Sequence, residues 1–204
     1  MVINNLRNRA LQLLQTYFGY TSFRPAQEAP VASLLQNEDV VAIMPTGAGK
    51  SICFQIPALC KSGISIVFSP LISLMKDQVD SLVDQNIPAA LINSTLTQTE
   101  FNKTMYEVRS GKIKLLYIAP ERLGSNFFCN VLRSMPISQV IVDEAHCISQ
   151  WGHDFRPSYR LIGDWLSSLP KRPVVGAFTA TATKAVENDI KKLVNDIHHS
   201  KHIF

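Results

Sequence analysis

One short segment, residues 44–51 (MPTGAGKS), most constrains what this chain can fold into. It follows the apolar run at 39–43, which predicts a buried strand, and it precedes residues 52–55, which predict the start of a helix. A glycine-containing turn that joins a strand to a helix and ends in lysine and a hydroxyl residue is the arrangement that holds a nucleotide triphosphate. The segment therefore predicts a phosphate-binding loop. The strict pattern has glycine where Met44 stands, so a chance turn is the alternative.

Lys50 and Ser51 carry the chemistry of such a loop. The lysine would reach the β- and γ-phosphates, and the serine hydroxyl would hold a magnesium ion. Glycine has no side chain, so backbone N–H groups at Gly47 and Gly49 can point at phosphate oxygens. The expected cradle consists of Thr46, Gly47, Ala48, Gly49, Lys50 and Ser51.

The composition is that of a folded intracellular protein. The 204 residues suggest one domain or two small ones, and 46% hydrophobic residues can bury a sizeable core. The net charge of +4 permits a polyanionic partner without requiring one. The four cysteines form no CxxC pair, which favours buried free thiols over a zinc site or disulfides. We expect no membrane span and no secretory signal.

Apolar runs alternate with helical stretches along the chain, which predicts an α/β fold with a mostly parallel sheet flanked by helices. Pro30 is expected to bend or split the second helix, and Pro57 to kink or shorten the third. The histidine-rich tail (His198, His199 and His202) is expected to be a solvated end. Strands are predicted at 39–43, 64–68, 89–92, 115–119, 140–142 and 174–178, and helices at 5–17, from 25, from 52, from 71, at 97–109, 125–134, 158–168 and 184–196.

Two acids, Asp143 and Glu144, directly follow the predicted strand at 140–142. In a chain that also has the lysine-serine loop, Asp143 would hold magnesium opposite Ser51, and Glu144 would orient and deprotonate the water that attacks the γ-phosphate. The alternative is a helix start that favours acids. Threonines at 179–183 follow the sixth strand, and their hydroxyls could bond the carboxylates or His146, or simply cap a helix.

With these stretches together, the chain resembles the first, N-terminal RecA-like lobe of RecQ-family DNA helicases, over about residues 11–185. In this family methionine is usual at position 44. Residue 48 is alanine where glycine is common, Lys76 replaces a frequent glutamine, and Phe178 replaces leucine. The matching stretches are 18–27 (motif 0), 44–51 (motif I), 69–79 (motif Ia), 117–123 (motif Ib), 143–159 (motif II with an aromatic-rich loop) and 178–182 (motif III).

The resemblance implies a three-layer RecA-like P-loop NTPase domain spanning 1–204, with residues 1–36 as N-terminal helices carrying motif 0. It also implies ATP and Mg²⁺ as cofactors. Gln27, with Arg24 nearby, would read the adenine. A ring of Tyr17, Phe18 or Tyr20 could pack on the base, and the sequence does not choose among them. The implied catalytic residues are Lys50, Asp143, Glu144 and His146.

The aromatic-rich loop at 151–156 would sense single-stranded DNA and signal to Glu144 and His146. Aromatic faces stack on bases without regard to sequence, and an arginine supplies charge. Core packing is the alternative reading of these aromatics, but the polar residues around them favour an exposed loop. The residues implied in DNA binding and coupling are Trp151, His153, Phe155, Arg156, Thr179 and Thr181.

The stretch after motif III contains no second RecA-like lobe, zinc module or winged helix, so we expect a fragment that binds ATP but hydrolyses it poorly. The intact enzyme would move 3′ to 5′ on DNA in repair and recombination. It would be a monomer in a bacterial cytoplasm at the nucleoid, or in the nucleus if eukaryotic, and bacteria are favoured. The alternatives are an RNA-directed DExH lobe and a non-catalytic nucleotide- or DNA-binding module.

Overall fold

The computed structural model describes residues 2–195 and 202–203. Seven strands form one sheet in the order β3-β4-β2-β5-β6-β1-β7, and all the paired strands run parallel. The helices are α1 (Val2–Phe18), α2 (Pro25–Leu35), α3 (Lys50–Cys60), α4 (Ile72–Asp84), α5 (Gln98–Arg109), α6 (Asn126–Arg133), α7 (Arg160–Ser167) and α8 (Lys184–Asn195). The strands are β1 (Val40–Ile43), β2 (Ile64–Phe68), β3 (Ala89–Ile92), β4 (Leu115–Ile118), β5 (Ile137–Val142), β6 (Val174–Thr179) and β7 (His202–Ile203).

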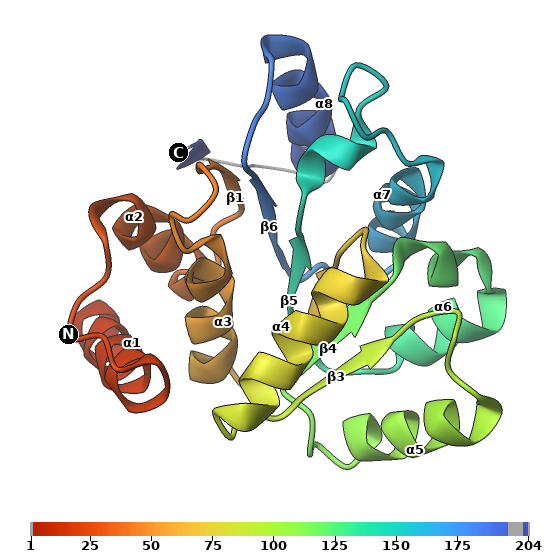
Figure 1. The fold of residues 1–204 in the computed structure, drawn as a ribbon, viewed down its shortest axis with the longest axis horizontal. Coiled ribbons are helices and arrows are strands. Elements are labelled where there is room, and N and C mark those ends of the chain that lie inside the picture. The colour runs from red at the N-terminus through yellow and green to blue at the C-terminus, as the bar shows by residue number, and fades with distance from the viewer. Residues whose placement is uncertain (1, 196–201, 204) are drawn as a thin grey trace.

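Helices cover both faces of the sheet, as predicted for a parallel α/β domain. Buried side chains of α1 to α4 form one core with one face of the strands, and those of α5 to α8 form a second core with the other face. Figure 1 shows α1, α2 and α3 gathered on the left of the sheet and α6 and α7 on the right. Ile66 and Phe68 of β2 lie in the second core while Val67 lies in the first, which explains why this strand reads as a continuous apolar run.

The prolines do not break their helices. Pro30 lies inside a continuous α2, so it does not split that helix, and α3 runs past Pro57 to Cys60, so the helix does not end at that proline. Both prolines are buried. Their helices pack Val31, Leu34 and Phe54 into the core, and this burial outweighs the one hydrogen bond that each proline removes.

Other sequence predictions are confirmed or corrected in detail. The capping box at Thr97 and Glu100 opens α5, and Gly111 adopts φ +72° shortly after its end. Strand β5 begins at Ile137, three residues earlier than predicted, and β7 was not predicted at all. His198 and His199 lie outside the described residues. No helix in the described part of the chain is long and apolar enough to cross a membrane.

Candidate functional site

The carboxyl ends of three neighbouring strands, β5, β6 and β1, bring the predicted motifs together. The backbone N–H of Met44, just after β1, donates to the carbonyl of Thr179 at the end of β6, at 2.9 Å. The segment that begins at Asp143 follows β5. Strand β5 pairs with one edge of β6, and β1 pairs with the opposite edge of β6. Ligands bind outside the carboxyl ends of the strands in open α/β sheets, so this edge is the expected place for a site.

The loop at 44–51 has the backbone that its glycines predicted. Gly47 and Gly49 adopt φ +82° and +80°, a region that favours glycine, and Gly49 is the residue from which α3 begins at Lys50. The Lys50 ammonium lies back over the loop, with Nζ donating to the Met44 carbonyl at 3.3 Å. Thr46 and Gly47 are exposed, whereas Ala48, Gly49, Lys50 and Ser51 are half-buried.

Gln27 and Arg24 connect α2 directly to this loop. The Gln27 side-chain amide is buried and donates to the carbonyl oxygens of Ala48 (3.2 Å) and Gly49 (3.0 Å). Its Oε1 accepts from the backbone N–H of Arg24 at 2.9 Å, which completes the N-terminal cap of α2. The Arg24 guanidinium donates to the Gly47 carbonyl at 2.7 Å. Two residues predicted to contact adenine therefore also hold the phosphate loop in place.

The three candidate stacking rings differ in exposure. Tyr17 and Phe18 are half-buried and pack against the core beneath α1. Tyr20 is 50% exposed and follows Gly19, whose φ of +74° turns the chain out of the helix. Tyr20 is therefore the ring most available to a ligand.

Asp143 is a buried carboxyl group with an unusual pKa. Burial and the neighbouring Glu144 raise its pKa to about 6, whereas a hydrogen bond from the Gln78 side chain acts to lower it. The Tyr159 hydroxyl, fully buried, donates to the Asp143 carbonyl at 2.9 Å and anchors this turn from below. A carboxylate placed here lacks compensation by solvent, so it is suited to a cation partner.

Glu144, His146 and Thr179 form a hydrogen-bonded chain across the β5 and β6 ends. His146 Nδ1 lies 3.2 Å from Glu144 Oε2 and 2.8 Å from Thr179 Oγ1. The Thr179 hydroxyl gives its own hydrogen to the carbonyl of Thr181, so the hydrogen shared with His146 must sit on Nδ1. The His146 hydrogen bond holds the pKa of Glu144 below its usual range, which keeps that group ionised. Glu144 itself adopts φ +47°, a strained backbone for a non-glycine residue.

The aromatic-rich loop is only partly exposed. Trp151 is 75% exposed, and His153 stacks its ring on that of His146 with centroids 4.4 Å apart. Phe155 is half-buried beneath the Arg160 guanidinium, 5.2 Å from its ring centre. The Arg156 side chain binds Asp154 at 3.1 Å and the Pro70 carbonyl at 2.7 Å. Thr181 is exposed.

The oxygen donors at this edge fit a magnesium ion. Mg²⁺ takes oxygen ligands and is bound in nucleotide sites by one or two protein groups together with phosphates. Ser51 offers a hydroxyl at the start of α3, and Asp143 offers a buried carboxylate. These are the two residues that sequence reasoning assigned to the ion.

Four further residues shape the site and had no predicted role. Gln78 and Tyr159 hold Asp143, and both fall inside stretches that had been recognised as motifs. The Ser149 hydroxyl, fully buried, donates to Asp189 of α8 at 2.7 Å and accepts from the Trp151 N–H at 3.2 Å. Their contacts join segments up to 65 residues apart (78 to 143), so no local pattern signals them.

Comparisons with known proteins agree with this geometry. Residues 24–189 match the family model described as DEAD/DEAH box helicase. The chain is 51% identical over 186 residues to the ATP-dependent DNA helicase RecQ of Bacillus subtilis, covering 91% of this chain and 32% of that protein. It is 47% identical over 190 residues to the protein of the same name in Pasteurella multocida, covering 93% and 30%. The chain thus spans about a third of the length of these relatives.

Solved structures share the fold. The DUF1998 helicase MrfA bound to DNA aligns with a TM-score of 0.72 at 16% identity, over 96% of this chain and 28% of that one. A hypothetical ATP-dependent RNA helicase from Sulfolobus tokodaii aligns with a TM-score of 0.69 at 22% identity, over 98% of this chain and 56% of that one. At these identities the likeness concerns the RecA-like fold alone.

Proposed function

The chain belongs to the DEAD/DEAH box helicase family, and from that membership we propose that it is the ATP-binding lobe of a RecQ-type DNA helicase. The observation that carries the proposal is the meeting of the lysine-serine loop, the Asp143–Glu144 pair and Thr179 at one edge of the sheet. The similarity to RecQ helicases extends over nine-tenths of the chain.

ATP would bind over the loop at 44–51. Lys50 would exchange its contact with the Met44 carbonyl for the β- and γ-phosphates, and the N–H groups from Gly47 onward would face the phosphate oxygens. Gln27 and Arg24 would contact the adenine, with Tyr20 as the available stacking ring. Magnesium, held by Ser51 and Asp143, would neutralise charge on the phosphates.

Hydrolysis would use Glu144 as the base that orients and deprotonates the attacking water. The carboxylate is ionised before the water arrives, and the hydrogen bond from His146 that holds its pKa below the usual range also fixes its position. His146 would hold Glu144 in place. It would connect Glu144 to Thr179 through a hydrogen bond, and to the aromatic-rich loop through the stacked ring of His153. That chain of contacts is the route by which DNA at the loop would alter hydrolysis.

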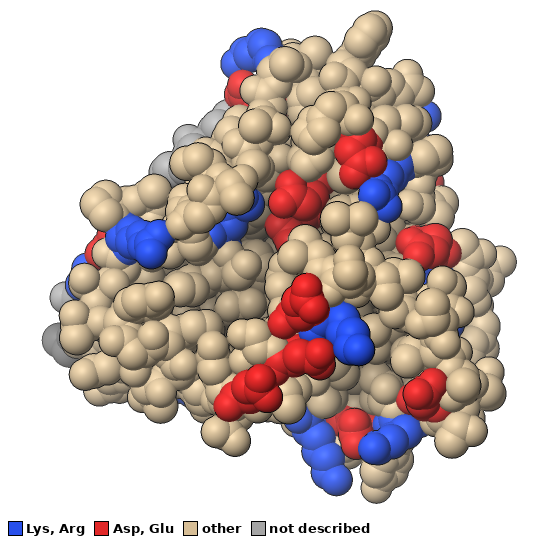
Figure 2. All heavy atoms as spheres, viewed as in Figure 1, with Lys and Arg blue, Asp and Glu red and all other residues tan. Residues whose placement is uncertain are grey.

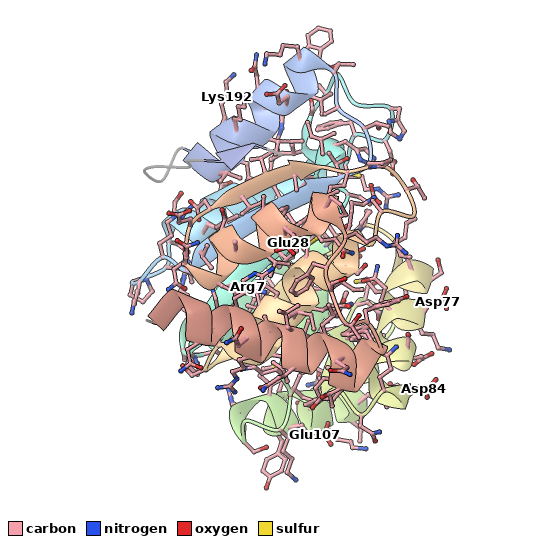
Figure 3. The ribbon with its side chains drawn as sticks, turned by 90° about the vertical axis from the view of Figure 1, so that its left-hand side faces the viewer. Arg7, Glu28, Asp77, Asp84, Glu107 and Lys192 are labelled. Carbon is pink, nitrogen blue, oxygen red and sulfur yellow. The ribbon has the colours of Figure 1, made fainter. Side chains whose placement is uncertain are left out.

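Single-stranded DNA would cross the surface at Trp151. The exposed indole offers a face for base stacking, worth roughly 1–3 kcal/mol per base. The outer face of α4 is an unsuitable path for phosphates, because Asp77, Asp80 and Asp84 are exposed on that helix. Figure 3 shows Asp77 and Asp84 projecting from α4, and Figure 2 shows acidic side chains on the surface in the same view as Figure 1.

Full activity would need a second RecA-like lobe that supplies arginines to the ATP site, an effect worth about a thousandfold or more in rate. The chain alone would bind ATP and hydrolyse it poorly. Within a whole enzyme it would drive 3′ to 5′ translocation and duplex unwinding in DNA repair and recombination. We place that enzyme, as a monomer, in the bacterial cytoplasm at the nucleoid.

ATP binding by the Lys50→Ala variant tests the assignment. Loss of the ammonium should abolish measurable affinity for a fluorescent ATP analogue, while Lys103→Ala, an exposed lysine on α5, should leave it unchanged. Equal affinity of Lys50→Ala and the parent would contradict the site. Stimulation of ATP hydrolysis in the intact enzyme by RNA but not by single-stranded DNA would overturn the choice of DNA.

A further inference from the structure

Three metal-binding groups of different kinds converge beside the proposed hydrolytic centre. A ring nitrogen of His146, the thiol of Cys147 and a carboxylate oxygen of Asp154 all lie within 4.8 Å of one another. Cys147 is fully buried, His146 is nearly so, and Asp154 is half-exposed at the open side of the cluster. We propose that these three residues form a binding site for a soft or borderline divalent cation, with Zn²⁺ as the best match.

The chemistry of the donors selects the ion. Thiolate, imidazole and carboxylate are the three ligand types that zinc takes from proteins, whereas Mg²⁺ prefers oxygen alone. Atoms bound to one tetrahedral zinc at about 2.0–2.3 Å lie roughly 3.3–3.8 Å apart. Cys147 Sγ already lies 3.7 Å from Asp154 Oδ2, so only a small closure of the loop is needed. Three protein ligands leave a fourth position for water or for His153, which stacks on His146.

The hydrogen bonds of His146 indicate which ring nitrogen would bind an ion. Its Nδ1–H is held by Glu144 Oε2 at 3.2 Å and by Thr179 Oγ1 at 2.8 Å, which leaves Nε2 as the nitrogen free to coordinate. A carboxylate that holds the other ring nitrogen is the usual support of a metal-bound histidine, since it fixes the tautomer and raises the basicity of the ligand.

Charged groups already surround the cluster. Asp154 Oδ2 is paired with the Arg156 guanidinium at 3.1 Å, and Lys50 and His153 lie near the Glu144 carboxylate, so a bound ion would share Asp154 with Arg156. Burial and Asp154 raise the pKa of the Cys147 thiol to about 12, so the sulfur carries its proton until a metal displaces it. Binding would release that proton to solvent and form the sulfur–metal bond, with no change in oxidation state.

The site would tie two functional segments together. His146 and Cys147 belong to the turn after β5, while Asp154 belongs to the aromatic-rich loop. A bound ion would therefore hold the loop against the segment that carries Glu144. That consequence for hydrolysis rests on the proposed function, but binding of the ion does not.

Cobalt binding by the 204-residue chain tests the proposal. Co²⁺ substitutes for zinc and gives a sulfur-to-metal absorption band only when a thiolate coordinates. The parent background should carry alanine at His198, His199 and His202, so that a metal held by the tail does not obscure the result. This parent should show the band, and adding Zn²⁺ should abolish it by displacement.

The variants separate this site from other metal contacts. Cys147→Ser should abolish the band and weaken zinc affinity at least about tenfold, whereas Cys129→Ser, a buried thiol bonded to the Leu123 carbonyl, should leave both unchanged. If circular dichroism shows that Cys147→Ser does not fold, the zinc affinity of Asp154→Asn becomes the deciding measurement. The half-exposed Asp154 side chain tolerates this change, and the variant should bind zinc at least about tenfold more weakly. A parent without the band, or unchanged affinity in the deciding variant, would overturn the proposal.

Discussion

The side-chain nitrogen of Gln27 donates to the carbonyl oxygen of Gly49 at 3.0 Å, and a β-carbon added at Gly49 would lie 2.3 Å from that nitrogen. Glycine at this position therefore serves two purposes: it permits the positive φ and leaves room for the amide. The contact makes the shape of the phosphate loop depend on α2, which lies more than twenty residues earlier in the chain.

Replacing Gln27 should weaken nucleotide binding even before any contact with adenine is considered. Gln27→Ala removes the hydrogen bonds to Ala48 and Gly49, and Gln27→Glu places an acceptor against two carbonyl oxygens. We expect ATP affinity to fall roughly tenfold or more in both, which corresponds to about 1.4 kcal/mol. Titration with a fluorescent ATP analogue measures this affinity. Gln36→Ala, an exposed glutamine at the end of α2, is the control and should bind ATP normally.

Thr179→Val should separate hydrolysis from binding. The valine removes the acceptor of the His146 Nδ1–H bond and the donor to Thr181, which costs about 1–2 kcal/mol of unfolding free energy in urea titrations. In the intact enzyme the turnover number should fall while ATP affinity is kept, because the phosphate loop is untouched. Thr99→Val changes an exposed side chain on α5, outside the site, and should alter neither quantity. Normal turnover in Thr179→Val would argue against a role for His146 in holding Glu144.

Trp151→Ala should uncouple DNA from ATP hydrolysis. The indole is 75% exposed, so its loss should leave thermal stability unchanged while single-stranded DNA affinity falls by roughly 5- to 150-fold, equivalent to about 1–3 kcal/mol. In the intact enzyme, stimulation of ATP hydrolysis by DNA should disappear and the basal rate should remain. Tyr106→Ala removes a 68% exposed aromatic from α5 and serves as the control. DNA stimulation that persists in Trp151→Ala would refute our interpretation of the loop.

Asp39→Asn should be strongly destabilising. The Asp39 carboxylate is 4% exposed, lies 2.6 Å from the Arg172 guanidinium and accepts from the Val175 N–H at 2.8 Å, which ties the start of β1 to β6. Removing the charge leaves the Arg172 guanidinium without its negatively charged partner, and we expect a loss of about 3 kcal/mol in unfolding free energy.

The exposed ion pair between Arg7 and Glu28, which lie together across α1 and α2 in Figure 3, is the matched control for Asp39→Asn. Glu28→Gln should cost about 0–1 kcal/mol, because solvent screens such a pair. If the two variants lose equal stability in urea titrations, burial does not strengthen the Asp39 pair.

Stability should rise with pH through the titration of Lys61. Burial lowers the pKa of its ammonium from 10.5 to about 8. The unfolded chain keeps this proton up to about pH 10.5, so between pH 8 and 10.5 it binds more protons than the folded chain, and the unfolding free energy increases with pH. Between pH 7.5 and 9 the increase should be smaller in Lys61→Gln than in the parent, and unchanged in Lys103→Gln. Parallel curves for Lys61→Gln and the parent would contradict the lowered pKa.

Local patterns in the sequence predicted the elements well where one physical constraint dominated. Strands β1 to β6 were predicted because most of their side chains are buried, so that Val67 and Phe68 read as part of one apolar run although they face opposite cores. The turn at Gly47 and Gly49 and the cap at Thr97 were predicted because each depends on neighbours within a few residues. A split of α2 at Pro30 and an end of α3 at Pro57 were predicted wrongly, because packing against the rest of the chain, absent from a local pattern, outweighs a missing hydrogen bond.

The sequence by itself determined the phosphate loop, the acids after β5, and the parallel α/β fold, since these follow from residue types and spacing along the chain. Only the tertiary structure decided that Gln27 is hydrogen-bonded to the phosphate loop and that His146 lies between Glu144 and Thr179. The same is true of the binding of Arg156 to Asp154 and Pro70. These contacts depend on the strand order β5-β6-β1 and on the docking of α2. The strand order and the docking of α2 are both stabilised by burial of apolar side chains in two cores. No short segment of sequence encodes that sum.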